Sequence, residues 1–393
     1  MFCSECGKPN QDSANFCYAC GQRVNQNSGS DGAAAPHAHS SGSVLQSIGN
    51  RISSLASTDQ LDGFSLSEFF SEVFKKRTKD EIDDYFVVGT SRTTPRIEDV
   101  ATSWPKPWFF FRVLTFVALL YFGFYFAFEQ FENIRLIPGL IMMGSLAVPL
   151  ATVILFFELN IPRNVSFNRV LMLVASGGVV SLFVALIGFK VSNLNWLGAS
   201  GAGIVEEVGK LLAVILVARS FRGKYILNGL LFGAAVGAGF AFFESAGYAF
   251  DYLERTNSLS VMFDVIQSRA FLTPFGHVAW TAIAAAALWR VKGDSPFQLN
   301  MLLNPGFLRT MSIPVVLHML WNAPFETPFE LHHIVLGIVG WFVVFGLVQQ
   351  GLHQIRQEQE QGAQARADIP DVVPGVAPAT GPQLVQPMTA TAA

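Results

Sequence analysis

The sequence predicts an all-α polytopic membrane protein with about eight transmembrane helices, preceded by a small N-terminal zinc ribbon. Of its 393 residues, 51% are hydrophobic and only 14% are charged, which is too apolar for a soluble protein of this length. The apolar residues gather in long runs, and every cysteine lies within the first 20 residues. The net charge of −3 says nothing about nucleic acid, but the lack of a basic patch with interleaved aromatic residues argues against a nucleic-acid partner.

Residues 1–25 are expected to form the zinc ribbon. Cys3, Cys6, Cys17 and Cys20 give the spacing C-x2-C-x10-C-x2-C, in which two thiolate pairs can close a tetrahedral Zn²⁺ site. A disulfide pair or a redox CxxC is the alternative, but paired motifs in so short a segment favour structural zinc. The segment resembles bacterial zinc-ribbon modules with the pattern CxxCG…FCxxCG. Such modules often serve as adaptors, which implies a cytoplasmic protein partner.

Two stretches of biased composition are expected to lack a fold. Residues 26–60 are rich in Ser, Gly, Ala and Asn, which is typical of a flexible linker. Residues 353–393 are of low complexity and predict a disordered C-terminal tail.

Residues 61–107 are expected to form two short amphipathic helices on the cytoplasmic side, packed on the membrane domain or lying at the membrane surface. Ser65 with Glu68, and Thr78 with Glu81, each fit a capping box at the start of a helix.

The membrane domain is expected to occupy residues 108–352, where apolar runs match the roughly 20-residue length of a transmembrane helix. The predicted spans are 109–128, 136–157, 168–188, 196–217, 227–248, 269–289, 311–324 and 333–350. Basic residues gather in the loops after the even-numbered spans, so the positive-inside rule places both termini in the cytoplasm. We therefore expect an integral protein of a bacterial cytoplasmic membrane, surrounded by the lipid bilayer.

The fourth predicted span holds three ionisable residues, Glu206, Glu207 and Lys210. An ionised side chain at the centre of a membrane helix costs roughly 2.5–3.5 kcal/mol. Lys210 can reach either carboxylate along the helix, but one lysine cannot neutralise two glutamates. A structural ion pair needs only one Glu, so the second favours a function.

The next three spans carry further polar side chains: Glu244 on the fifth, His277 on the sixth, and His318 and Asn322 on the seventh. Each by itself could simply join two helices by a hydrogen bond. Counting the helical rise from the span ends predicts that all of them meet in the middle-to-outer part of the bilayer. Carboxylates and imidazoles together supply the base, acid and anion stabiliser that water activation requires.

This arrangement resembles the PrsW family of intramembrane proteases, distant relatives of the CAAX-processing and Abi (CPBP) membrane proteases. The segment EEVGK fits the motif EExxK, FAFFE fits FxxxE, and His318 with Asn322 fits HxxxN. The resemblance implies cleavage of membrane-anchored protein substrates, as in regulated proteolysis signalling.

The resemblance also implies a role for each residue. Glu206 or Glu207 would be the general base, and His277 would assist it or hold the substrate carbonyl. His318 and Asn322 would stabilise the oxyanion. In addition, Lys210 would tune the glutamate pair, and Glu244 would position the water or a histidine.

Two questions stay open at this point. A catalytic metal and a metal-free glutamate mechanism both fit these residues, although the Glu-rich site without HExxH favours the glutamate mechanism. A proton- or ion-coupled transporter, or a catalytically inactive scaffold, would be the alternative functions. Transporters often show paired halves with broken helices, and a scaffold would lack a complete Glu/His set.

Overall fold

The computed structural model describes residues 44–367, except for residues 62, 79, 80, 83, 220, 222 and 326. The chain divides into two units, Met1–Val44 and Leu45–Ala393, and the described fold belongs to the second. The predicted zinc ribbon with its four cysteines and the last part of the predicted tail lie outside the described residues. Within the described residues the regular structure is entirely helical, as the sequence predicts.

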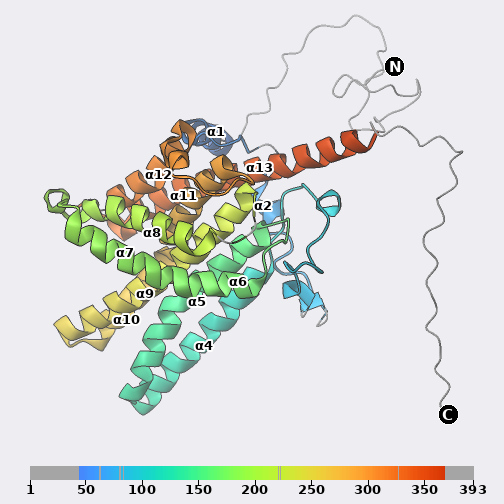
Figure 1. Cartoon of the computed structure of the whole chain (residues 1–393). Helices are drawn as coiled ribbons and strands as arrows, with labels where there is room; N and C mark the ends of the chain where they lie inside the picture. The colour runs from blue at the N-terminus through green and yellow to red at the C-terminus, as the bar shows by residue number, and fades with distance from the viewer. Residues whose placement is uncertain are drawn as a thin grey trace, which may run out of the picture. The chain divides into compact units, whose positions relative to one another are not determined.

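The membrane domain is built from ten helices and short helical turns between them. The helices are α4 (Phe109–Phe131), α5 (Ile137–Leu159), α6 (Phe167–Met172), α7 (Gly178–Val191), α8 (Ala202–Ala218), α9 (Ile226–Thr256), α10 (Leu259–Leu272), α11 (His277–Lys292), α12 (Pro305–Trp321) and α13 (Leu331–Ala367). α4 and α5 run side by side as a hairpin, and α9 packs along α11 (Figure 1).

Six helical segments among the described residues are long and apolar enough to cross a membrane, so the predicted count of eight is not confirmed. The other two predicted spans correspond to α8 and α12, which have 17 residues each. At 1.5 Å per residue each is about 26 Å long, short of a hydrocarbon core of roughly 30 Å. α8 is short because Gly198, with φ of 58°, breaks the helical path before Ala202.

Two predictions of disorder are wrong in part. Helix α1 (Val44–Ala56) lies within the predicted linker 26–60, and α13 continues to Ala367, well into the predicted tail 353–393. α1 carries apolar residues at helical spacing among its serines, and α13 ends in Gln, Glu, Ala and Arg, which are strong helix formers. Composition alone therefore underestimated the helices at both ends of the domain.

The end of α1 is held by basic residues of the membrane domain. Arg309 of α12 donates to the carbonyl oxygens of Ser54 and Leu55, and Arg290 of α11 donates to that of Ser57. Cations at the C-terminal end of a helix satisfy carbonyl groups that have no partner within it. α1 is thereby joined to α11 and α12.

Of the two predicted capping boxes, one forms. The backbone N–H of Thr78 donates to the Glu81 carboxylate at 2.7 Å, and the Glu81 N–H donates back to Thr78 Oγ1 at 3.2 Å. Ser65 makes no capping bond, because its hydroxyl bonds Ser67 instead. The helix that starts there, α2 (Leu66–Phe69), has only four residues.

Glycines set the two helix contacts on which the site depends. A Cβ on Gly237 of α9 would lie 2.4 Å from the carbonyl oxygen of His277, and a Cβ on Gly203 of α8 would lie 2.6 Å from the backbone nitrogen of Met319. Any larger residue would push these backbones apart. The glycines therefore let α9 approach the start of α11, and α8 approach the end of α12.

The start of α4 is held by a buried carboxylate of α5. Glu158 accepts hydrogen bonds from the backbone N–H groups of Trp108, Phe109 and Phe110 at 2.7–2.8 Å, and from the Tyr85 hydroxyl at 2.9 Å. Burial, together with the neighbouring Glu158 charge, raises the pKa of Tyr85 well above its ordinary range, so the phenol remains a donor. The negative carboxylate satisfies the free N–H groups at the positive end of α4.

We expect Glu158→Gln to lower the free energy of unfolding by about 1–3 kcal/mol, because an amide nitrogen cannot accept from the buried N–H groups. Denaturant titration of the purified protein in detergent measures this loss. Glu129→Gln, at an exposed position of α4, is the matched control and should leave the midpoint unchanged. Equal midpoints for Glu158→Gln and the wild type would contradict the capping role.

Candidate active site

Three of the polar residues singled out in the sequence, Glu206, His277 and His318, lie near helix ends, whereas Lys210 and Glu244 lie well inside α8 and α9. The predicted span 196–217 would place Glu206 near the middle of its helix, but Glu206 is the fifth residue of α8, about 6 Å from its start. His277 is the first residue of α11, after a break at Gly276 that interrupts the predicted span 269–289. His318 lies in the last turn of α12.

The ammonium group of Lys210 lies at the centre of the cluster, completely buried. It donates to Glu207 Oε1 at 2.5 Å and to His277 Nδ1 at 2.8 Å, and it lies 4.6 Å from the centre of the Phe240 ring. An ammonium group can only donate, so Nδ1 of His277 must accept and the ring carries its proton on Nε2. Lys210 therefore selects the tautomer of His277.

The other ring nitrogen of His277 points to Glu244. Its Nε2 lies 3.0 Å from Glu244 Oε2, and the same oxygen pairs with the guanidinium of Arg269. Arg269 also donates to the Ser245 hydroxyl at 3.0 Å, and its guanidinium lies over the Tyr248 ring. Both nitrogens of His277 are thus engaged by protein groups.

Sequence analysis missed Arg269, which lies on α10. The signal was present, since an arginine stands beside the apolar segment that contains His277. As the first residue of the predicted span 269–289, Arg269 has the position of a basic side chain that reaches the membrane surface. Ser245 and Tyr248 of α9 and Trp280 of α11 also line the site without having been predicted.

His318 is fixed by a different partner. Its Nδ1 lies 2.8 Å from Glu207 Oε1, and its ring stacks on Trp280 with the ring centres 4.6 Å apart. The Glu207 carboxylate accepts, so Nδ1 of His318 carries the proton. The Nε2 lone pair is left facing Glu206 Oε2 at 3.8 Å.

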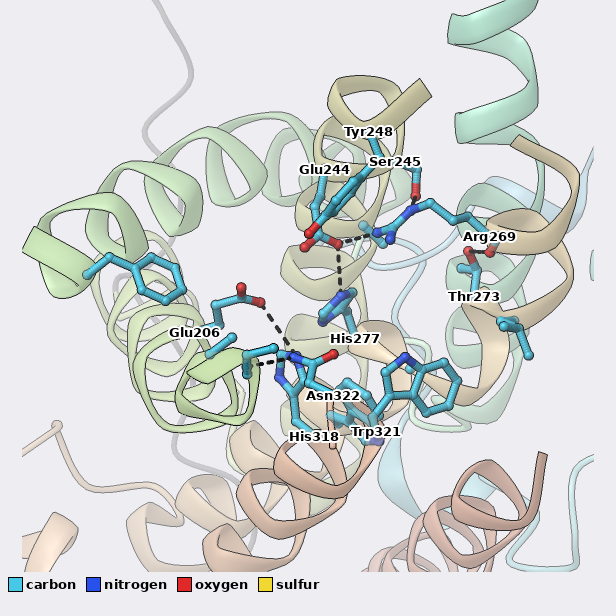
Figure 2. A pocket seen from close by; sticks show the side chains of 17 residues that line it. Glu206, Glu244, Ser245, Tyr248, Arg269, Thr273, His277, His318, Trp321 and Asn322 are labelled. Atoms are coloured by element: carbon cyan, nitrogen blue, oxygen red, sulfur yellow. Dashed lines mark hydrogen bonds and ion pairs between the residues drawn. The ribbon is translucent and has the colours of Figure 1, made fainter. Parts of the chain in front are cut away.

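Glu206 differs from its neighbour. Glu207 is fully buried and held by Lys210 and His318, whereas Glu206 lines a cavity of about 350 Å³. The buried Oε2 atoms of Glu206 and Glu207 both accept no hydrogen bond from the described residues, but of the two glutamates only Glu206 lines the cavity. Figure 2 shows Glu206 and Glu244 reaching into this cavity together with His277 and His318, each from a different helix.

Asn322 lines the same cavity but stands apart from the linked cluster. It caps the C-terminal end of α12, and its side-chain nitrogen donates to the carbonyl oxygen of Ala199 at 3.4 Å. The structure thus joins six of the seven predicted residues by hydrogen bonds or short ionic contacts. It places the seventh, Asn322, at the edge of the cavity.

The donor atoms also fit a metal ion in part. Glu206, His277 and His318 can each offer one ligand atom, all within 4.8 Å of one another, and two imidazoles with one carboxylate form a common catalytic zinc set. His318 has the orientation of a ligand, with Nδ1 bound to a carboxylate and Nε2 free. His277 would first have to release Lys210.

Residues 138–348, more than half of the chain, match the family described as PrsW family intramembrane metalloprotease, and residues 2–24 match a zinc-ribbon domain. No curated protein and no solved structure gives a significant match. The first match contains every residue of the cavity cluster, and the second contains all four cysteines. The predicted resemblance is confirmed, and the chain belongs to the PrsW family of intramembrane proteases.

Proposed function

We propose that the protein hydrolyses a peptide bond of membrane-anchored protein substrates, and that Glu206 is the general base. The observation that carries this proposal is the Glu206 Oε2 atom, which accepts no hydrogen bond from the described residues and lies 3.8 Å from His318 Nε2, both residues lining the cavity. One water with hydrogen bonds of about 2.8 Å to each atom can bridge that distance. Family membership favours hydrolysis over the transporter and the inactive scaffold.

In this mechanism Glu206 removes a proton from the bridging water, and the water oxygen attacks the carbonyl carbon of the substrate. Glu206 then returns the proton to the leaving amine. His318 orients the water through Nε2, and Glu207 holds His318 in the required tautomer. Asn322 uses one N–H to bond Ala199 and keeps the other for the oxyanion that develops on the substrate.

His277 receives a different role from the one that the family resemblance implies. Since Lys210 and Glu244 occupy its two nitrogens, it acts as a connector between the two charged groups rather than as a base. Arg269 holds Glu244 in place from the other side. These residues position Lys210, which in turn positions Glu207.

We favour the metal-free glutamate mechanism because the Lys210 ammonium already occupies Nδ1 of His277. If the enzyme uses a metal ion, Glu206, His318 and a released His277 would hold it, and the ion would polarise the carbonyl and lower the pKa of bound water.

We further propose that both termini face the cytoplasm of a bacterial cell. Arg290 and Arg309 lie at the end of the domain where α1 docks, which agrees with a positive inner face. The zinc ribbon would then lie in a reducing compartment, where thiolates persist, and could receive a regulatory protein partner.

We expect Glu206→Gln to lower the rate of substrate cleavage by about 100- to 10,000-fold, because an amide cannot take the proton of water. Cleavage of co-expressed single-span proteins, followed by the same assay with purified enzyme in detergent, measures the rate. Glu254→Gln, at an exposed position of α9, is the control and should cleave normally. Undiminished cleavage by Glu206→Gln would refute Glu206 as the base.

The ion pair between Lys210 and Glu207 makes a separate prediction. Lys210→Met leaves a buried carboxylate without its partner and should lower stability by about 3–5 kcal/mol. The double variant Lys210→Met/Glu207→Gln removes both charges and should recover most of that loss. Both variants should remain poorly active, since His277 loses Lys210 in each of them and His318 also loses the Glu207 carboxylate in the double variant. A double variant no more stable than the single one would contradict this coupling.

A chain that lacks residues 1–25 separates ribbon zinc from any metal of the cavity. We expect this chain to keep basal cleavage, since the ribbon acts as an adaptor, and to remain active after treatment with a zinc chelator. Cleavage and metal content are measured before and after chelation. Loss of activity that added zinc restores would establish the metal mechanism, and inactivity before chelation would contradict the adaptor role.

A further inference from the structure

A second group of metal-ligating side chains lies outside the cavity, where α12 connects to α13. Glu330, His332 and His333 each offer one ligand atom, and these atoms lie within 4.8 Å of one another. The carboxylate of Glu330 is 59% exposed, so a solvated ion can reach it. Neither the family match nor the proposed mechanism gives this group a role.

Both ring nitrogens of His333 face groups that can only accept hydrogen bonds, so a neutral ring cannot satisfy both contacts. Its Nε2 lies 3.1 Å from the carbonyl oxygen of Trp321, which can only accept, so Nε2 carries a proton. Nδ1 lies 2.6 Å from the Glu330 carboxylate, another pure acceptor. In the neutral ring Nδ1 holds a lone pair, and that lone pair would face the carboxylate. The contact therefore requires a cation: either a second ring proton or a bound metal ion.

Two further features favour the metal ion. His332 Nδ1 bonds the Thr327 hydroxyl at 2.8 Å, which can accept its proton and so turn the Nε2 lone pair outward. In metal sites a ligating histidine usually bonds a protein acceptor through its other nitrogen, and both histidines have such a partner here. The rings of His332 and His333 also lie close together, with their centres 3.7 Å apart.

The backbone brings the carboxylate to the histidines. Glu330 has φ of 56°, a left-handed conformation that is uncommon for a residue with a side chain. It ends the short turn η8 (Pro328–Glu330) directly before α13. In a tetrahedral zinc site neighbouring ligand atoms are about 3.4 Å apart. The ligand atoms here lie within 4.8 Å of one another, and the exposed Glu330 side chain can move to bring them to the spacing of a zinc site.

We propose that Glu330, His332 and His333 bind a zinc ion, with water completing the coordination. A carboxylate with two imidazoles suits zinc among the divalent ions, whereas calcium and magnesium prefer oxygen ligands alone. His333 also packs on Trp321, with ring centres 4.2 Å apart, and Trp321 lines the catalytic cavity. The ion thus fastens the connection between α12 and α13 next to Trp321, a residue of the cavity lining.

The test compares zinc binding by full-length variants in detergent, by competition with a chromophoric chelator. The wild type should bind one more zinc ion than His332→Gln or Glu330→Gln, or bind that ion more than about 100-fold more tightly. His353→Gln is the matched control, because His353 lies further along α13, where it contacts Asp59. All variants keep the four cysteines and Glu206, so any difference belongs to this site.

Equal stoichiometry and affinity in the wild type and both variants would overturn the proposal and leave a doubly protonated His333 as the cation.

Thermal unfolding gives a second measurement, which does not depend on zinc counting. Added zinc should raise the midpoint of the wild type and of His353→Gln by more than that of His332→Gln or Glu330→Gln. The same shift in all four proteins would also reject the site. The result does not depend on whether the enzyme proves to be a protease.

Discussion

The buried ammonium of Lys210 is the interaction on which the rest of the site depends. It links the carboxylate of Glu207, on its own helix, to the imidazole of His277 on α11. From His277 the chain of contacts continues to Glu244 and Arg269, and from Glu207 it continues to His318. Five helices are therefore joined by a chain of ion pairs and hydrogen bonds that passes through the two imidazoles. Leaving any of these charged groups buried without its partner would be costly.

The balance of charges within this cluster explains why Glu206 differs from the other two glutamates. Three carboxylates, those of Glu206, Glu207 and Glu244, face only two permanent cations, Lys210 and Arg269. Glu207 and Glu244 hold the short contacts, while Glu206 is 3.9 Å from the Lys210 ammonium. The carboxylate without a close cation is Glu206, which lines the cavity and keeps a buried oxygen without a hydrogen bond. Such a group suits proton removal from water.

Two breaks in the helical backbone determine where the residues of this cluster lie along their helices. The break at Gly198 starts α8 close to Glu206, and the break at Gly276 starts α11 at His277. The N-terminal ends of both helices thus bring partial positive charge toward the carboxylates. Irregular backbone inside a membrane is tolerated where it lines a cavity, because water and polar side chains satisfy its free groups.

Much of the protein could be predicted from the sequence alone. Hydropathy is a local property, so the membrane class was readable, and the cysteine spacing was enough to identify the ribbon. Polar side chains are so costly in apolar spans that Glu206, Glu244, His277 and His318 stood out individually. The helix breaks could not be predicted, because an apolar run looks the same whether or not packing interrupts it.

Arg269 pairs with Glu244, which lies 25 positions away along the chain. That pairing, and the difference between Glu206 and its neighbour, were decided only by tertiary structure, since both depend on which helices meet.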